Sequence, residues 1–226
     1  MREAQGFLAK TLGDLVRLSL VHISAEAWAV TKRPWPTSST AMTAQILLIR
    51  HGQSTFNAIF DQTNVDPMHF DAPLSHHGWQ QVDLARQKLT MLPPPDLVIC
   101  SPLTRAIETT LGLFGGSEIP ITVSCHHRER LGNSCDVGRP PGVLAAAFPM
   151  LSFQHLRDPW WYQGEPDMRG VHVEPEDVFL RRVEEFRTWV GAQHGRLAVV
   201  GHGTFFHRLT GLHFENCEMV EWNPTS

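Results

Sequence analysis

The feature that most restricts the fold of this chain is a series of short apolar runs separated by longer segments with a helical pattern. The runs cover residues 46–49, 97–100, 119–123 and 197–200. Three of them are continuously apolar, which is typical of strands that are buried on both faces. Strands that alternate with helices indicate an α/β domain with a mainly parallel sheet.

The segments between these runs have the spacing of amphipathic helices. The predicted helices cover residues 74–92, 104–114, 175–194 and 204–212. The first of them has Ser75 as its expected N-cap and three prolines after its end, and the second is followed by two glycines. Residues 125–174 are rich in Pro, Gly, Trp and Arg, and we expect this segment to form an inserted cap over one end of the domain.

Residues 1–44 differ from the rest of the chain. They contain a loose helical stripe of apolar residues, followed at 32–40 by a linker rich in helix breakers. Met42 lies just before the first strong strand. We interpret residues 1–44 as an N-terminal extension and linker, either because Met42 is the true start or because the extension is a docking or targeting helix. The first interpretation is favoured.

Charge and cysteine usage exclude several classes of protein. The formal net charge is −4 and the isoelectric point is about 6.3, so the chain lacks the basic field that would bind nucleic acid. The four cysteines show neither a C-x-x-C pair nor zinc-site spacing, which predicts a reduced cytoplasmic protein. No apolar run is long enough for a membrane span, so no membrane partner is expected.

Arginine and histidine residues follow three of the predicted strands. The first strand is followed by Arg50 and His51, the second by a segment that ends in Arg105, and the last by His202 and Gly203. The carboxyl ends of parallel strands meet at one edge of a sheet, where such folds bind their ligands. Arginine forks match phosphate oxygens, and glycines and helix N-termini add backbone donors. The sequence therefore predicts a phosphate site.

Four motifs in this order resemble the histidine phosphatase superfamily, in its phosphoglycerate mutase-like branch. They are LIRHGQSTFN at 48–57, DAPLS at 71–75, SPLTRAIET at 101–109 and VGHG at 200–203. Three of the motifs close a predicted strand, which makes the match specific. The resemblance covers roughly residues 45–220. It implies a three-layer α/β/α sandwich at 45–226, with the cap inserted at about 125–174.

The resemblance also implies roles for the residues at the strand ends. His51 would be the nucleophile and would form a phosphohistidine through Nε2, while its other ring nitrogen donates to an acceptor such as a backbone carbonyl. Arg50 and Arg105 would bind the phosphoryl oxygens. His202 would contact the phosphoryl group as a cationic donor. Asn57 matches a position that contacts phosphate.

Gly203 completes the expected substrate-binding residues. The resemblance also makes Glu129 the candidate general acid, which would protonate the leaving oxygen and then activate water. A solvated surface position is the alternative for Glu129, and Asp136 is a rival acid. No metal is expected, since arginines would neutralise the charge, and no cofactor is expected.

Other residues have structural interpretations that compete with functional ones. Residues 160–162, Trp-Trp-Tyr, could line a substrate pocket, but aromatic residues in a cap more often form its own small core. The histidine pairs at 76–77 and 126–127 are interpreted as surface pairs, not as ligands.

The resulting functional prediction is a metal-independent phosphatase that acts on a small phosphorylated substrate. The alternatives are a phosphoglycerate mutase-type phosphotransferase and a non-catalytic module that binds a phosphorylated ligand. Residues 56–70 depart from the pattern of the mutases, and the cap offers Arg157 and Arg169 but no adjacent arginine pair for a substrate carboxylate. The sequence indicates neither the physiological substrate nor the oligomeric state.

Overall fold

The sheet at the centre of the fold is mainly parallel. The computed structural model describes residues 44–224. Its strands are β1 (Gln45–Arg50), β2 (Leu97–Cys100), β3 (Ile121–Val123), β4 (Arg196–Gly201) and β5 (Met219–Trp222). They lie in the order β3-β2-β4-β1-β5, in which only the β1–β5 pair is antiparallel. The predicted α/β class with a mainly parallel sheet is confirmed.

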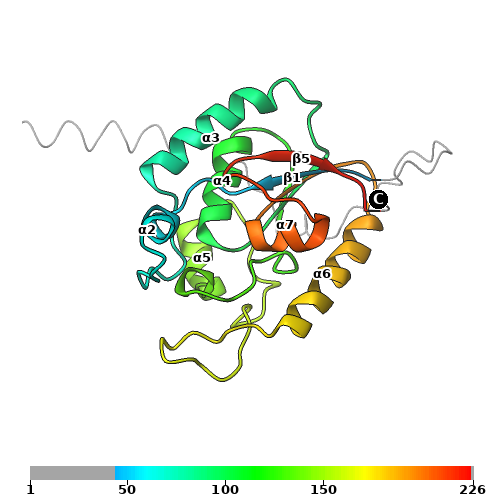
Figure 1. Cartoon of the computed structure of the whole chain (residues 1–226). Helices are drawn as coiled ribbons and strands as arrows, with labels where there is room; N and C mark the ends of the chain where they lie inside the picture. Colours follow the sequence, from blue (N-terminus) through cyan, green and yellow to red (C-terminus); the bar gives the residue numbers. More distant parts are fainter. Residues whose placement is uncertain (1–43, 225–226) are drawn as a thin grey trace, which may run out of the picture. The chain divides into compact units, whose positions relative to one another are not determined.

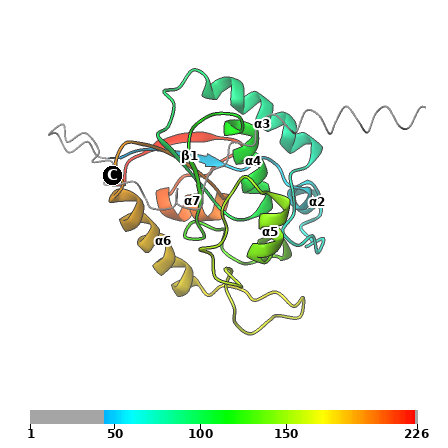
Figure 2. The same ribbon diagram turned by 180° about the vertical axis from the view of Figure 1, so that it is seen from behind.

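Helices cover both faces of this sheet (Figure 1, Figure 2). They are α2 (Thr55–Thr63), α3 (His76–Leu89), α4 (Thr104–Phe114), α5 (Pro141–Ala147), α6 (Glu176–Gly191) and α7 (Gly203–Thr210), with a short 3₁₀ helix, η2 (Ser134–Asp136). All four predicted helices are present. Ser75 caps α3, since its side chain accepts from the Gly78 N–H, and α4 ends at Gly115.

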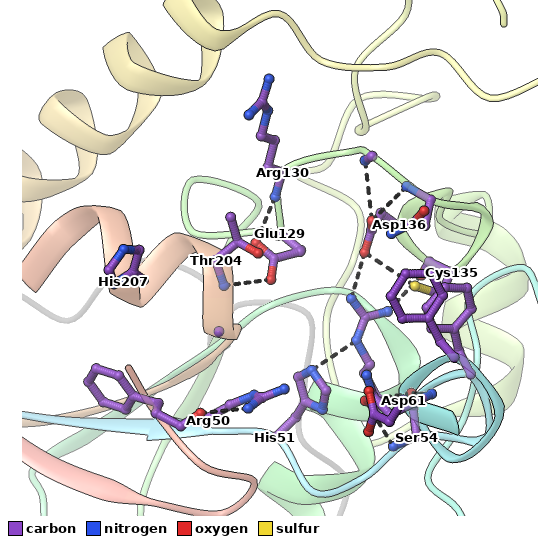
Figure 3. Close-up of a pocket in the computed structure, with 18 of the residues that line it drawn as sticks. Arg50, His51, Ser54, Asp61, Glu129, Arg130, Cys135, Asp136, Thr204 and His207 are labelled. Carbon is purple, nitrogen blue, oxygen red and sulfur yellow. Dashed lines mark hydrogen bonds and ion pairs between the residues drawn. The ribbon is translucent and has the colours of Figure 1, made fainter. Parts of the chain in front are cut away.

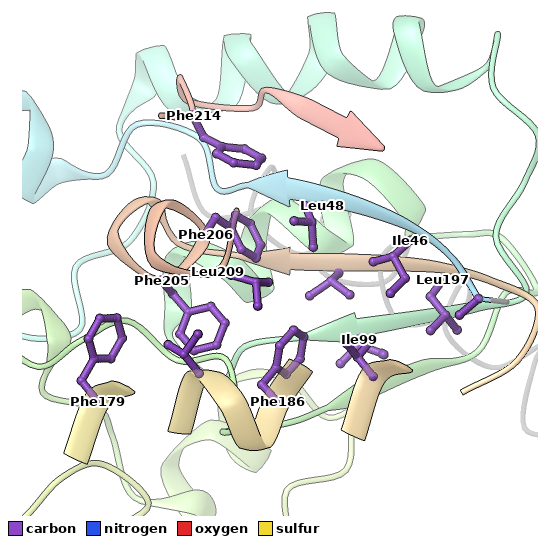
Figure 4. Close-up of a cluster of buried hydrophobic side chains, with 14 residues drawn as sticks. Ile46, Leu48, Ile99, Phe179, Phe186, Leu197, Phe205, Phe206, Leu209 and Phe214 are labelled. Atoms are coloured by element: carbon purple, nitrogen blue, oxygen red, sulfur yellow. The ribbon is translucent and has the colours of Figure 1, made fainter. Parts of the chain in front are cut away.

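Two hydrophobic clusters join the layers. On one face of the sheet, apolar side chains of β1 and β4 pack against α6 and α7 (Figure 4). On the other face, the alternate side chains of the strands pack against α3 and α4. Successive side chains of a strand point to opposite faces, so strands covered on both sides must be apolar throughout. The three-layer α/β/α sandwich is thus confirmed.

The segment between β3 and α6 contains its own small core. Trp160 is buried among Leu144 and Phe153, and its ring N–H donates to the Arg139 carbonyl at 2.9 Å. A Cβ at Gly138 would lie 2.1 Å from the Trp160 ring, so this packing requires glycine there. Trp160 and the partly buried Trp161 therefore belong to this core, as the structural interpretation predicts, whereas Tyr162 lies outside it. The two tryptophans also line a second cavity, which is distinct from the one that contains His51.

Among the described elements, four have no counterpart in the sequence analysis: α2, β5 and, within the cap segment, α5 and η2. Helix α2 has nine residues and buries one of them, Phe56, and its clearest sequence signal is the N-cap Ser54. Strand β5 is a short edge strand with no fully buried residue. Such short elements bury little apolar surface of their own and depend on tertiary contacts. The predictions for residues 1–43 lie outside the described residues.

The length and apolar character of the helices can be compared with those of a membrane span. Across residues 44–224, none of the helices combines the length and the apolar character needed to span a bilayer.

Candidate active site

The parallel register of β1 and β4 brings two histidines together. Arg50 is paired with Gly201, so the residues that follow, His51 and His202, leave the sheet side by side. Their ring centroids are 5.2 Å apart, and the exposed fractions of His51 and His202 are 4% and 0%. The predicted convergence of strand ends is therefore present, and it produces a buried pair of imidazoles.

The tautomer of His51 is set by its own backbone neighbourhood. Nδ1 lies 2.7 Å from the Gly52 carbonyl, to which it can only donate, so Nε2 is the unprotonated nitrogen. Nε2 in turn accepts from Nε of Arg105 at 3.1 Å. Burial, followed by the charges of Arg105 and Arg50, lowers the pKa of His51 well below its usual value. His51 thus has the geometry of a neutral imidazole, with its Nε2 lone pair directed at the Arg105 side chain in the wall of the pocket.

Arg105 is held in place by two acceptors from the 3₁₀ helix η2. Its exposed fraction is 3%, and it donates to the Cys135 carbonyl at 2.6 Å and to Oδ1 of Asp136 at 2.8 Å. The second oxygen of Asp136 accepts from the backbone N–H groups of Gly132 and Asn133. Asp136 is therefore committed to Arg105 and to its own loop, which leaves it poorly placed as the rival acid.

Arg50 lies on the side of His51 that faces away from Arg105 (Figure 3). It donates to the Phe214 carbonyl at 2.5 Å, while its buried Nε has no hydrogen-bond partner among residues 44–224. A Cβ at Gly203 would lie 3.1 Å from that Nε, so glycine allows the guanidinium to approach the start of α7. A buried donor without an acceptor is costly, and an anion in the pocket would satisfy it.

His202 is the N-cap residue of α7. Its Nε2 lies 2.7 Å from Oγ of Ser101, and its buried Nδ1 has no partner within the described part of the chain. Burial, then the charges of Arg105 and His51, lowers its pKa well below the usual value. Burial and the nearby charge of Arg105 therefore disfavour the cationic form of His202 in the substrate-free site, whereas the resemblance implies a cationic donor.

Glu129 lies in the loop after β3 and reaches the first turn of α7. Its carboxylate accepts from the backbone N–H groups of Thr204 at 2.9 Å and Phe205 at 3.0 Å. It lines the same pocket as His51 (Figure 3). Burial, and then the charge of Asp136, raises the pKa of Glu129, although its backbone donors and Arg105 oppose the shift. A carboxyl group with a raised pKa in the same pocket as an unprotonated imidazole nitrogen suits proton transfer.

Asn57 contributes to the pocket from α2. Its Oδ1 accepts from the backbone N–H and the hydroxyl of Ser54, and its own N–H donates to Oγ of Ser54, so the two residues form a capping box. Because the oxygen is used in this way, the side-chain NH₂ remains as the donor for an anion. The predicted phosphate contact is compatible with this arrangement.

These residues surround a cavity of about 530 Å³. Six of the seven predicted site residues line this cavity. The seventh, His202, is fully buried, with its ring next to that of His51. The remaining lining is mixed: Phe60, Phe214 and Val173 are apolar, Asp61 and Arg130 are charged, and the rings of His207 and His213 are stacked with their centroids 4.1 Å apart. In the described residues, no group of three His, Cys, Asp or Glu side chains could hold a metal ion.

Sequence reasoning missed three residues that support the site. Ser101 contacts His202, Asp136 binds Arg105, and the side-chain NH₂ of Asn216 donates to the His51 carbonyl at 3.0 Å. Ser101 lies within a recognised motif and Asp136 was noted only as an acid, whereas Asn216 precedes the unpredicted strand β5 and carries no local signal.

The surface interpretation is also wrong for His127. It is fully buried, its Nε2 lies 3.0 Å from the Val200 carbonyl, and burial lowers its pKa to about 3. The ring packs against Phe186 and Phe205 beneath α7, an environment that the sequence of a loop does not reveal.

Comparison with known proteins assigns a family. Residues 46–226 match the histidine phosphatase superfamily, branch 1. The chain is 28% identical to a phosphoglycerate mutase-like protein of Arabidopsis thaliana, over 77% of this chain and 82% of the relative.

Solved structures share the fold at lower identity. The α-ribazole phosphatase of Shigella flexneri is 21% identical, with a TM-score of 0.53 over 77% of this chain and 88% of that one. An ecdysone phosphate phosphatase from Bombix mori, in complex with tungstate, is 16% identical, with a TM-score of 0.52 over 78% and 87%.

Proposed function

The chain belongs to the histidine phosphatase superfamily, branch 1, and from this premise we propose that it is a phosphatase that hydrolyses a phosphomonoester through a phosphohistidine intermediate. Membership of this family and its structural relatives support phosphatase or mutase-like activity. The observation that carries the finer proposal is the state of His51, which is neutral, with Nδ1 bound to the Gly52 carbonyl and Nε2 facing the pocket.

In the proposed first step, Nε2 of His51 attacks the phosphorus atom and the bond from phosphorus to the ester oxygen breaks. The carboxyl group of Glu129, whose pKa is raised by burial, gives a proton to the departing oxygen in this step. Arg50 and Arg105 bind the phosphoryl oxygens from opposite sides of His51, and their charge stabilises the transition state. The product of this step is the alcohol, with the phosphoryl group on His51.

In the second step, a water molecule attacks the phosphorus atom and the bond from phosphorus to Nε2 breaks. Glu129, now a carboxylate, accepts a proton from the attacking water and returns to its initial state. The electron pair of the broken bond returns to His51, which is again neutral. The two arginines supply positive charge at the phosphoryl group, and we therefore propose that the reaction needs no metal ion and no cofactor.

The ion pairs formed by arginines of the cap favour phosphatase over phosphoglycerate mutase activity. Arg169 is bound to Asp66 at 3.0 Å and to Asp167, and Arg139 is bound to Asp71 at 2.6 Å. Arg157 lines a different cavity from His51. Arg139 and Arg169 are therefore paired with carboxylates outside the pocket. Among the arginines at 125–174, Arg130 lines the pocket, where it pairs with Glu176 at 2.5 Å. A mutase uses several cationic residues of its cap to hold the carboxylate of its substrate.

One experiment distinguishes the proposed phosphatase from its two alternatives, a mutase and a ligand-binding module. The purified protein is incubated with a panel of phosphorylated metabolites, and phosphate release is measured together with mass spectrometry of the peptide that contains His51. Release of phosphate with phosphorylated His51 is the expected result. Transfer of the phosphoryl group to a second metabolite without release indicates a mutase, and binding without turnover or phosphohistidine indicates a ligand-binding module.

We propose a small phosphorylated molecule as the substrate and the cytoplasm as the location. The four cysteines are all unpaired, which suits a reducing compartment. Fractionation of the source cells with an antibody against this chain tests the location, and recovery in a secreted or membrane fraction would contradict it.

A further inference from the structure

One arginine of α6 holds the backbone of the loop that carries Glu129. Arg182 donates to the carbonyls of His126 at 3.1 Å, Arg128 at 2.7 Å and Glu129 at 3.4 Å. Its exposed fraction is only 7%. A single planar guanidinium therefore binds three carbonyls in the loop of residues 125–131, here called the acid loop.

A buried carboxylate keeps this arginine in one orientation. Glu174 has an exposed fraction of 0% and accepts from Nε of Arg182 at 3.1 Å and from a terminal nitrogen of Arg182 at 2.6 Å. Two parallel bonds of this kind fix the plane of a guanidinium. Glu174 also accepts from Arg128 at 3.0 Å, and its backbone N–H donates to the Leu131 carbonyl at 2.8 Å. Glu174 thus ties the Arg182 side chain to the acid loop.

Arg182 also contacts the helix on which the Glu129 carboxylate rests. Its guanidinium carbon lies 5.4 Å from the centre of the Phe205 ring, within the range of a cation–π contact. The backbone N–H of Phe205 is one of the donors to the Glu129 carboxylate. Arg182 therefore touches both the loop that carries the carboxyl group and the helix turn that receives it.

We propose that Arg182 is a positioning residue: it fixes the acid loop so that the carboxyl group of Glu129 sits at the start of α7, within reach of the leaving oxygen. This proposal rests on the proposed function, in which Glu129 is the general acid. It goes further because neither the strand-end motifs nor the lining of the pocket points to α6. Loss of Arg182 should impair proton delivery and leave His51, Arg50 and Arg105 in place.

A substrate pair separates proton delivery from the rest of the reaction. Nitrophenolate leaves without a proton, whereas the alkoxide of glycerol 2-phosphate needs one. The ratio kcat/KM covers the steps up to departure of the first product, so hydrolysis of the phosphoenzyme does not enter it. The measured quantity is kcat/KM for p-nitrophenyl phosphate divided by kcat/KM for glycerol 2-phosphate.

The test uses Arg182→Lys, Arg182→Met and the control Arg181→Met. Lysine keeps the charge but cannot bind three carbonyls and Glu174 in one plane. Arg181 is the adjacent residue, is 67% exposed and pairs only loosely with Asp177 at 3.5 Å. We expect kcat/KM for the alkyl ester to fall about 10²-fold in the Arg182 variants, with a loss of less than about 10-fold for the aryl ester. Arg181→Met should change neither value.

Several results would overturn the proposal. If Arg182→Lys folds, as judged by its circular dichroism and melting curve, and keeps the wild-type ratio of the two kcat/KM values, Arg182 does not position the acid. Equal losses on both substrates would show a structural role alone. If Arg182→Met does not fold, the lysine variant decides. Failure of the proposed function is recognised separately, because the wild-type protein would then form no phosphohistidine.

Discussion

Nε2 of His51 lies 3.1 Å from Nε of Arg105, so the lone pair that we propose attacks phosphorus accepts an arginine N–H in the substrate-free site. The contact has two consequences. The positive charge opposes protonation of His51, which keeps the nucleophile neutral. In the proposed mechanism, the N–H turns from His51 to a phosphoryl oxygen when the substrate binds, so that neutralisation of the substrate and release of the nucleophile occur together.

Replacement of the nucleophile is the first test. His51→Ala should lower kcat by about 10³-fold or more and abolish the phosphorylated peptide, since the pocket holds no other acceptor in the place of Nε2. The measurement is turnover of p-nitrophenyl phosphate together with mass spectrometry. His76→Ala, an exposed histidine on α3, serves as the control. More than a tenth of the wild-type activity in His51→Ala would disprove the assignment.

Replacement of Glu129 by glutamine should distinguish its role by leaving group and by pH. We expect kcat/KM for an alkyl phosphate to fall about 10²-fold or more, and that for p-nitrophenyl phosphate much less. The raised pKa of Glu129 means that the protonated acid disappears as pH rises, so wild-type kcat/KM for the alkyl ester should fall on the alkaline side. Glu129→Gln should lose that alkaline decline. An unchanged pH profile in the variant would contradict the assignment.

Replacement of Asp136 should have a different signature, because this carboxylate binds Arg105 at 2.8 Å. Asp136→Asn removes the charge and loosens the arginine, so kcat/KM should fall about 10- to 100-fold for the alkyl and aryl esters alike. Inhibition by vanadate should weaken in parallel. A loss confined to the alkyl ester would identify Asp136 as the acid in place of Glu129.

Buried neutral histidines should make the fold sensitive to acid. Burial lowers the pKa of His127 from 6.5 to about 3, so the unfolded chain binds a proton on His127 before the folded chain does. The free energy of unfolding is therefore not reduced by His127 above pH 6.5, where this residue is neutral in both states. It falls as the pH is lowered from 6.5 toward 3, where only the unfolded chain is protonated at His127. For this residue alone the loss at pH 5 is about 2 kcal/mol. His51 and His202 act in the same direction.

The check is urea unfolding of the wild type and His127→Gln at pH 7 and pH 5. Glutamine can still donate to the Val200 carbonyl but does not titrate in this range. The free energy of unfolding should fall less between the two pH values in the variant than in the wild type. His76→Gln should behave as the wild type. The same pH dependence in all three proteins would refute the prediction.

Chelation tests the proposed independence from metal ions. Because Arg50 and Arg105 supply the positive charge, dialysis against EDTA should leave kcat/KM for p-nitrophenyl phosphate unchanged. Loss of activity after dialysis, with recovery on addition of a divalent cation, would show that a metal takes part. Arg105→Lys in the same assay should lose activity that no cation restores, since lysine lacks the planar fork.

The strand ends explain how much of the site could be predicted. Local apolar runs locate β1, β2 and β4, and the residues after a parallel strand must lie at one edge of the sheet. Arg50, His51 and His202 were therefore identifiable from the sequence. Their side chains do meet, with His51 and His202 5.2 Å apart.

The sequence by itself determined the layers, the parallel sheet and the edge at which the cationic and imidazole groups gather, because these follow from hydrophobic periodicity within short windows. Only the tertiary structure decided the burial that lowers the pKa of His202, the pairing of Asp136 with Arg105 and the contact of Arg182 with the acid loop. These depend on burial and on contacts between residues far apart in the chain. Arg182 binds the Glu129 carbonyl from 53 positions away, and no local pattern encodes such a contact.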